Sequence, residues 1–508
     1  MFQTLRVRIN NMARWESSSV KMLGGVEVAL GVTLLIPLII ALLYGEDAAI
    51  FVYPIPILLV FGVFQYTFFK SGDALRPASG MMMMSVAWAI AFLVSSVPFY
   101  LYGFSFIDSL FEGVSGFTTT GASVMADADL PHSILFWRSF TQWAGGLAVV
   151  LIFLFLIPMM GIGGKAFVNS EFAGSDTYNF SMRIKSAARN FVSIYVLLSI
   201  VEIVLLMVSG AEHFEAVTMT FSTISTGGFM SAGQSMADYS FAAQVIVLAF
   251  MFLGGTNFYL HYRALNKREF SAYRKSQEFI WTVVWFLTAT VIILAMVLIA
   301  AEDLFAVNVG AAAWETLFTV VSMGTTTGYA VADPSVWPLA AYVVMWMVML
   351  FGSMSGSTSG GIKIYRLLIL RSYIANGVYK MFHPRSVRDV RMDGHSVGGD
   401  TVVSAMVVIM MFILAVITSM IFLLVSEPGI SISESIGLSI SAISNTGINT
   451  GDIALQELNG ASKIFLSFMM WVGRLEVVMA LLLFTRTLWR DLLSDMRAGL
   501  HNMKGKKN

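Results

Sequence analysis

Long apolar stretches alternate with short polar stretches along almost the whole chain. A helix that spans a membrane needs about 20 mostly apolar residues. Such stretches occur near residues 23–44, 50–69, 81–103, 134–160, 190–209, 241–262, 279–301, 337–351, 402–425 and 462–485. The pattern therefore predicts ten membrane-spanning segments and an all-α polytopic membrane protein.

The composition agrees with a membrane protein. Of the 508 residues, 57% are apolar and 12% are charged, whereas soluble domains carry about 25% charged residues. The 31 basic and 31 acidic side chains cancel, so net charge gives no argument for a nucleic-acid partner. Cysteine is absent, which excludes disulfides, thiolate nucleophiles and cysteine metal sites.

The distribution of charge predicts an orientation. Clusters of Lys and Arg follow alternate spans, at 70–76, 165–185, 263–275, 363–391 and 486–497, whereas the opposite connections are acidic or neutral. Basic loops stay on the cytoplasmic side, so both termini are predicted to be cytoplasmic in a multi-pass membrane protein. The basic N-terminus precedes a long apolar segment without a cleavage site and is interpreted as a retained leader.

Four segments between the spans share one pattern and align without a gap. They are Asp108–Gly121 (DSLFEGVSGFTTTG), Glu215–Gly228 (EAVTMTFSTISTGG), Glu315–Gly328 (ETLFTVVSMGTTTG) and Glu434–Gly447 (ESIGLSISAISNTG). Each begins with a carboxylate, has a serine seven residues later and ends in glycine. The predicted fold is therefore four tandem span–pore helix–span repeats around one pore, plus an extra N-terminal helix pair.

The last four residues of each segment, here called the four tetrads, are the candidate ion site. An acid near the start of a short helix stabilises its positive end, so the negative ends of four such helices entering from outside would favour a cation. Backbone carbonyls of the tetrads could replace the water of the ion, and glycine permits positive φ and close approach. The predicted ion-binding residues are Thr118, Thr119, Thr120, Gly121, Ser225, Thr226, Gly227, Gly228, Thr325, Thr326, Thr327, Gly328, Ser444, Asn445, Thr446 and Gly447.

Each part of this pattern has a simpler alternative. The acids Asp108, Glu215, Glu315 and Glu434 are interpreted as N-caps of the short helices without direct ion contact. The terminal glycines are interpreted as filter positions, with turns that only pack helices as the alternative.

Residues Gly352–Gly361 interrupt an apolar span with small and hydroxyl side chains. The apolar run before them is too short to span alone, and each glycine costs a helix up to about 1 kcal/mol. The interruption predicts a flexible plug, with close packing of small residues between helices as the alternative. The candidate gate residues are Gly352, Ser353, Ser355, Gly356, Ser357, Thr358, Ser359, Gly360, Gly361, Lys363 and Arg474.

Two basic residues belong to this gate hypothesis. Arg474 lies inside an apolar span, where a charge costs about 2.5–3.5 kcal/mol, so it should face water or a partner. We expect it to border the cavity and raise the barrier to cations, with a structural pair to Glu476 or Glu202 as the alternative. Lys363 either belongs to the gate or ends the loop as a topology anchor at the cytoplasmic surface.

The repeats resemble the Trk and Ktr superfamily of potassium transport subunits from about Met81 to Leu488. GGTNFYLHYRAL (Gly254–Leu265), GSMSGSTSGGIKIYR (Gly352–Arg366) and WVGRLEVV (Trp471–Val478) look like family inner-helix and intramembrane-loop segments, and the extra helix pair points to the Trk branch. The resemblance implies potassium as substrate, with rubidium also accepted, a carbonyl-lined filter and a gate in the third-repeat loop. It also implies a homodimer with one pore per subunit and a cytosolic nucleotide-binding regulatory ring of the TrkA type.

Other functional classes have less support. No HExxH, P-loop or nucleophile-elbow motif occurs, so we expect no enzyme activity and no cofactor in this chain. Met81–Met84 is interpreted as apolar filler rather than as a soft-metal site. A proton- or sodium-coupled secondary transporter of another solute remains the alternative function, with Glu202 or Glu476 as the proton carrier.

The repeats predict six regions along the chain. These are an N-terminal helix pair with its leader (1–75), pore repeat 1 (76–170), pore repeat 2 (171–275), pore repeat 3 with the loop 352–363 (276–395), pore repeat 4 (396–500) and a basic tail (501–508).

Overall fold

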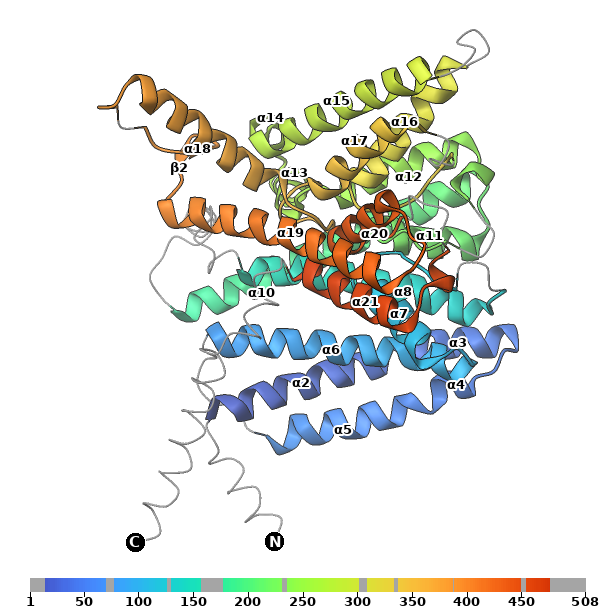
Figure 1. Cartoon of the computed structure of the whole chain (residues 1–508). Helices are drawn as coiled ribbons and strands as arrows, with labels where there is room; N and C mark the ends of the chain where they lie inside the picture. Colours follow the sequence, from blue (N-terminus) through green and yellow to red (C-terminus); the bar gives the residue numbers. More distant parts are fainter. Residues whose placement is uncertain are drawn as a thin grey trace, which may run out of the picture. The chain divides into compact units, whose positions relative to one another are not determined.

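The computed structural model of the protein describes residues 14–69, 77–125, 129–156, 177–230, 235–300, 308–332, 337–386, 388–448 and 454–475. These residues are mainly helical, which confirms the predicted all-α fold class. The chain forms two compact units (Figure 1). Unit 1 comprises 1–114, 129–137 and 475–508, and unit 2 comprises 115–128 and 138–474.

Unit 1 contains the extra N-terminal helices and the start of the first repeat. Its helices are α2 (Arg14–Thr33), α3 (Leu35–Tyr44), α4 (Ala49–Val52), α5 (Pro54–Phe68) and α6 (Pro77–Tyr102). Figure 1 shows α2 beside α5 and α6. A Cβ on Gly24 would lie 2.7 Å from the carbonyl oxygen of Gly62, so small residues let α2 and α5 approach closely. The Gln65 amide donates to the buried Glu27 carboxylate, with both N···O distances 3.0 Å.

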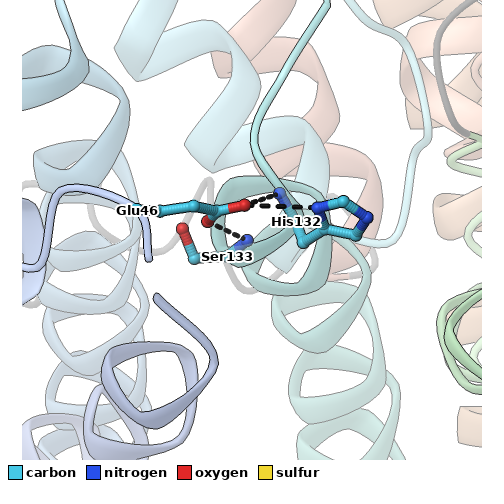
Figure 2. Close-up of polar contacts among 3 residues, drawn as sticks. All are labelled: Glu46, His132 and Ser133. Atoms are coloured by element: carbon cyan, nitrogen blue, oxygen red, sulfur yellow. Dashed lines mark hydrogen bonds and ion pairs between the residues drawn. The ribbon is translucent and has the colours of Figure 1, made fainter. Parts of the chain in front are cut away.

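A carboxylate also joins the N-terminal helices of unit 1 to the first repeat (Figure 2). Glu46 follows α3, and its two oxygens accept the backbone N–H groups of His132 (2.7 Å) and Ser133 (2.9 Å) at the start of α8 (His132–Leu156). The His132 ring stacks on Tyr44, with 4.0 Å between centroids. Glu46 therefore satisfies two donors that a helix N-terminus leaves unpaired.

Unit 2 holds the pore-type repeats. Four short helices correspond to the four aligned segments, namely α7 (Phe106–Phe117), α11 (His213–Ile224), α16 (Val309–Gly324) and α20 (Ile432–Ser444), of which α7 begins in unit 1. The helices before the last three are α10 (Thr177–Val208), α15 (Gln277–Ala300) and α19 (Gly399–Ser426). Figure 1 shows α15, α16 and α17 (Leu339–Leu350) adjacent, as the spanning helix, the short helix and the following apolar helix of the third repeat.

The helices that follow the short helices are less regular. In the second repeat, α12 (Phe241–Gly254) and α13 (Phe258–Asn266) meet at an angle of 101°, so the span predicted near 241–262 is broken between Gly254 and Phe258. In the third repeat, α17 ends at Leu350 and α18 (Ile364–Phe382) begins fourteen residues later, which confirms the predicted interruption. In the fourth repeat, α21 extends over Gly460–Arg474. Residues 476–485 of the tenth predicted span lie outside the described residues.

Length and hydropathy identify six spanning helices in the described part of the chain, or seven when the bent pair counts as one span. They are Ser19–Tyr44, Ala49–Phe68, Met82–Tyr102, Ser186–Val208, Gln277–Ala300 and Gly399–Ser426. The span predicted near 337–351 is instead a 12-residue apolar helix. The chain is therefore a multi-pass membrane protein. The basic clusters at 70–76, 165–176 and 486–497 and the tail 501–508 lie outside the described residues.

Two elements lie between the third and fourth repeats and outside the spans. β1 (Arg391–Met392) pairs with β2 (His395–Ser396) as an antiparallel hairpin. Asp393 and Gly394 both have positive φ, as a two-residue type I′ turn requires. The Asp393 carboxylate accepts the backbone N–H of Gln277 at 2.8 Å, which caps the start of α15. The short helix α14 (Ser271–Lys275) precedes α15.

Candidate functional site

The acids that begin the four segments do not cap the short helices, so that prediction is wrong. The N-caps are Glu212 for α11, Asn308 for α16 and Ser431 for α20. The side chains of Asn308 and Ser431 accept N–H groups of their helices, whereas Glu212 begins α11 without a side-chain hydrogen bond, and Glu434 completes a capping box with Ser431. The acids Asp108, Glu215 and Glu434 lie in the first turn of their helices, where they still oppose the positive end of the dipole. Glu315 lies further along α16 because that helix begins at Val309.

The four tetrads have the same unusual backbone conformation. The second residue has positive φ in every repeat, at Thr119 (55°), Thr226 (54°), Thr326 (58°) and Asn445 (58°). The closing glycine also has positive φ, between 76° and 84°, whereas the residue between them does not. Positive φ is rare for β-branched threonine and costs about 1–2 kcal/mol. The same strain in three repeats is unusual for ordinary turns, so the tetrads are the candidate functional site.

The hydrogen bonds of the tetrads place the N–H groups on one side. The third residue of each tetrad donates its N–H to the carbonyl of the serine five residues before it, at 2.8 Å for Thr120, 2.7 Å for Gly227, 2.8 Å for Thr327 and 2.9 Å for Thr446. The second residue donates to the carbonyl three residues before it in all four repeats. Because alternating φ turns successive N–H groups to one side and carbonyls to the other, the carbonyls are left facing away from the short helices.

The four tetrads close into one ring. A Cβ on each closing glycine would lie closer than 3.0 Å to the carbonyl oxygen of the third residue in another tetrad. The four pairs are Gly121 with Gly227, Gly228 with Thr327, Gly328 with Thr446, and Gly447 with Thr120. The order runs from the first repeat to the second, third and fourth and back to the first. The closing glycines are partly exposed, whereas the other tetrad residues are buried. The structure thus brings together all sixteen residues predicted as the ion site.

A second set of four glycines lies behind the ring. Of these, only Gly352 was among the predicted site residues, as part of the gate. Gly145, Gly254, Gly352 and Gly473 each face the carbonyl of the residue before a tetrad, namely that of Phe117, Ile224, Gly324 and Ile443. A Cβ would lie within 3.3 Å of that oxygen in each case. The segments that carry these glycines can therefore lie directly against the ends of the short helices. The sequence does contain one such glycine in each repeat, but the number of residues between this glycine and the tetrad varies, so the four do not align.

The third-repeat loop (352–363) packs against three tetrads. Thr358 Oγ1 accepts the hydroxyl of Thr226 at 3.2 Å, and the Gly360 N–H donates to Thr326 Oγ1 at 2.8 Å. A Cβ on Gly360 would overlap the carbonyl oxygen of Ser444. The loop is non-helical and its residues are largely buried, and its small residues also pack closely, since Gly352 lies against the Gly324 carbonyl and Gly360 against the Ser444 carbonyl.

The break in the second repeat receives the same loop. The Phe258 N–H donates to the Gly356 carbonyl at 3.0 Å, and the Thr358 N–H donates to the Gly254 carbonyl at 3.2 Å. The Thr358 hydroxyl also donates to the carbonyls of Gly254 (3.0 Å) and Ile224 (3.1 Å). The chain breaks at 255–257 therefore have a structural reason, because their backbone groups bind the loop of another repeat.

Lys363 and Arg474 both bind this loop. Lys363 is 7% exposed, and its Nζ donates to Ser359 and to the Gly360 carbonyl, so the interpretation as an anchor at the cytoplasmic surface is wrong. Arg474 is buried, and its Nη1 donates to the Thr358 carbonyl at 2.8 Å. Of the two acids considered as its partner, Glu202 is described and forms no ion pair with Arg474, whereas Glu476 lies outside the described residues.

Two polar residues at this site were not predicted. Glu278, at the start of α15, accepts the loop N–H of Ser355 at 2.7 Å and the N–H of Tyr365 at 3.3 Å. Gln142, in α8, donates to the Gly227 carbonyl at 2.7 Å and accepts the Phe229 N–H at 3.1 Å. Gln142 lies inside a predicted span, where a polar side chain is costly unless it has a buried partner, so its position was a signal. Glu278 precedes a predicted span in a polar stretch and gave no such signal.

The fold and this ring define a multi-span membrane protein in which four repeats, each with a short helix and a tetrad, converge on one ring. Residues 57–495 match the TrkH family, described as "Cation transport protein". The chain belongs to this cation transport family.

Individual relatives span nearly the whole chain. The Trk system potassium uptake protein TrkH of Vibrio parahaemolyticus is 29% identical, with 93% of this chain and 99% of the relative covered. The protein of the same name in Escherichia coli K12 is 28% identical over 90% of this chain and 96% of its own length. The crystal structure of the potassium transporter TrkH from Vibrio parahaemolyticus superposes with a TM-score of 0.85 at 27% identity, covering 93% of this chain and 99% of that one.

Proposed function

We propose that the protein mediates potassium uptake across the cell membrane through the ring of four tetrads. The observation that carries the proposal is the closed order of the ring, in which each closing glycine meets a carbonyl of another repeat. A ring of backbone carbonyls can replace the hydration shell of a monovalent cation. The choice of potassium is supported by the relatives, whose names describe potassium uptake.

The third-repeat loop is proposed as the gate of this pathway. It is held by two tetrad hydroxyl groups, by the backbone at the break of the second repeat, and by Arg474. We propose that the non-helical loop also has a released arrangement, in which these hydrogen bonds are broken. The positive charges of Lys363 and Arg474 raise the barrier to a cation while the loop is in place.

Uptake of rubidium and potassium in a potassium-uptake-deficient bacterium tests the proposal. The chain is expressed as wild type, Gly121→Ser and Gly328→Ser. Serine at either position must adopt positive φ, and its Cβ would overlap a carbonyl oxygen of the ring. We expect the wild type to restore growth at low potassium and both variants to lose the preference for potassium over sodium.

Gly45→Ser is the matched control. Gly45 also has positive φ (69°), but a Cβ there would meet no atom within 4 Å. The control variant should keep the wild-type ion preference at equal amounts of membrane protein. An unchanged preference in well-inserted Gly121→Ser and Gly328→Ser proteins would refute the ring as the selective element.

A coupled secondary transporter of another solute is the second candidate function. Its support is Glu202, a fully buried carboxyl group within the span of α10. Intramembrane acids often serve proton relays. Uptake that depends on a proton or sodium gradient, and is abolished by Glu202→Gln without loss of protein, would favour this candidate over passive flux through the ring.

The assembly and location of the protein are also part of the proposal. We place it in the bacterial inner membrane with both termini cytoplasmic, as a homodimer with one pore per subunit. A cytosolic nucleotide-binding ring of the TrkA type would act on the gate. The support is the family membership and the distribution of basic residues. Crosslinking in membranes and co-purification with the regulatory subunit would test the assembly.

A further inference from the structure

The second tetrad differs from the other three at its third position. Thr120, Thr327 and Thr446 each place a hydroxyl group within hydrogen-bond distance of the hydroxyl two residues earlier, at 2.7, 2.8 and 2.7 Å. The second tetrad has Gly227 at this position and therefore has no such bond. Its first residue, Ser225, donates to carbonyls of its own helix, Phe221 at 2.6 Å and Ser222 at 3.2 Å.

Gln142 occupies the space that the missing threonine leaves. A Cβ on Gly227 would lie within 2.8 Å of the Gln142 amide group. The Gln142 side chain is fully buried, and its amide group forms hydrogen bonds on both sides of the closing glycine, Gly228. Nε2 donates to the Gly227 carbonyl, and Oε1 accepts the Phe229 N–H. We call a side-chain hydrogen bond that holds a tetrad in this way a latch. The Gln142 latch joins two repeats, because the side chain comes from α8 of the first repeat. The three hydroxyl latches are each within one tetrad.

The carbonyl that Gln142 binds belongs to the ring. The Gly227 oxygen is the one that faces Gly121, as the Thr327, Thr446 and Thr120 oxygens face the other closing glycines. An oxygen that already accepts a hydrogen bond is held in position and offers less of its partial charge to a cation. One of the four ring oxygens at this level therefore has a different electrostatic environment from the other three.

We propose that Gln142 is a positioning residue for ion discrimination, because it holds the Gly227 carbonyl in the ring as the threonine hydroxyl groups hold the other tetrads. This inference rests on the proposed cation pathway through the ring. Gln142 does not contact the ion. It acts through the position of Gly227 and of the closing glycine that follows.

The first test substitutes Gln142 and measures an ion ratio. Full-length wild type, Gln142→Met and Gln142→Glu are reconstituted in liposomes, and the rates of potassium and sodium flux are compared. Met keeps the length of the side chain but removes both hydrogen bonds, and Glu keeps the acceptor but removes the donor. We expect both variants to lower the potassium-to-sodium ratio about fivefold to tenfold, the factor expected from one hydrogen bond.

The second test rebuilds the threonine latch in the second tetrad. Gly227→Thr alone should lower the ratio and the flux, because its side chain would collide with Gln142. The double variant Gln142→Ala with Gly227→Thr removes the collision and supplies a hydroxyl two residues after Ser225. We expect it to recover the potassium-to-sodium ratio to within about threefold of wild type, a non-additive result that marks direct coupling. A double variant no more selective than the worse single variant overturns the proposal.

Gln244 supplies the matched control. It is also a buried glutamine whose amide donates to loop carbonyls, those of Met236 (3.0 Å) and Tyr239 (3.1 Å), and its oxygen accepts the Trp314 indole N–H. Gln244→Met should leave the ion ratio unchanged. An equal shift in Gln244→Met, or a wild-type ratio in well-folded Gln142→Met, overturns the role of Gln142. A wild-type chain without potassium preference would instead refute the proposed function itself.

Discussion

The four tetrads and the third-repeat loop are both non-helical backbone in the membrane region, but they are built differently. The tetrads repeat one conformation four times, and their main bonds return to their own short helices. The loop occurs once, and its bonds go to the second, third and fourth repeats and to Glu278. A repeated, locally bonded ring suits a fixed ion site, whereas a single loop held by scattered contacts suits an element that moves. Substitutions of the closing glycines of the ring should change which ion passes, and those that remove contacts of the loop should change how fast it passes.

The largest expected effect in the loop comes from Gly360→Ala. A Cβ at this position would overlap the Ser444 carbonyl and lie 3.0 Å from Asn445 Cβ. Overpacking of this kind costs about 1–3 kcal/mol, so docking of the loop should weaken by roughly thirtyfold. We expect faster potassium flux with an unchanged potassium-to-sodium ratio. Gly377→Ala in α18 is the control, because a Cβ there meets no atom within 4 Å.

Arg474→Ala should have the next largest effect. The variant removes a positive charge and the bond to the Thr358 carbonyl. We expect flux to rise about tenfold at equal expression, because the electrostatic barrier to a cation falls. Arg474→Lys keeps the charge and should give a smaller increase. Unchanged flux in Arg474→Ala would contradict a role in the barrier and leave a structural one.

Removing one tetrad hydroxyl that binds the loop should have a moderate effect. Thr326→Val leaves the Gly360 N–H without its acceptor, which costs about 1 kcal/mol and should raise flux about fivefold. Thr119→Val is a closely matched control, since Thr119 has the same backbone conformation but its buried hydroxyl has no hydrogen-bond partner among the described residues. Equal flux in the two variants would show that the bond to Gly360 does not hold the loop.

The smallest effect is expected outside both regions, at Glu46. Burial by itself would raise the pKa of this carboxyl group, but hydrogen bonds from Ser133 and His132 outweigh burial and hold the pKa below its usual range. A lowered pKa means that the carboxylate stabilises the fold at neutral pH and that this contribution is lost as pH falls below about 4.3.

Glu46→Gln tests that contribution by thermal unfolding in detergent. The variant should lose about 1 kcal/mol of stability at pH 7 and less at pH 4, with no change in ion ratio. Asp400→Asn, at an exposed acid in the first turn of α19, should change stability less. A loss for Glu46→Gln that is the same at both pH values would contradict the ionised contact.

The sequence predicted which segments repeat better than it predicted where their helices begin or bend. Hydropathy and the aligned segments predicted four short helices and the sixteen tetrad residues, because both signals are local and recur four times. The N-caps were assigned to the wrong residues, because the aligned acids lie inside the helices. In α20, for example, the alignment began at the second polar residue of a capping box. The bend between α12 and α13 was not predicted, because its broken backbone bonds are satisfied by a loop about 100 residues later.

The amino-acid sequence by itself determined the membrane class, the fourfold repeat and the position of the interrupted span. These follow from periodic hydropathy and from residue types whose conformational preferences act over a few positions. Only the tertiary structure decided the cyclic order of the ring, the burial of Lys363 under the loop and the latch that Gln142 supplies to the second repeat. The contacts of the ring and of Gln142 join residues 85 or more positions apart, whereas those of Lys363 are local but place it in the interior rather than at the surface. All of them depend on which backbone atoms the packed helices leave without partners.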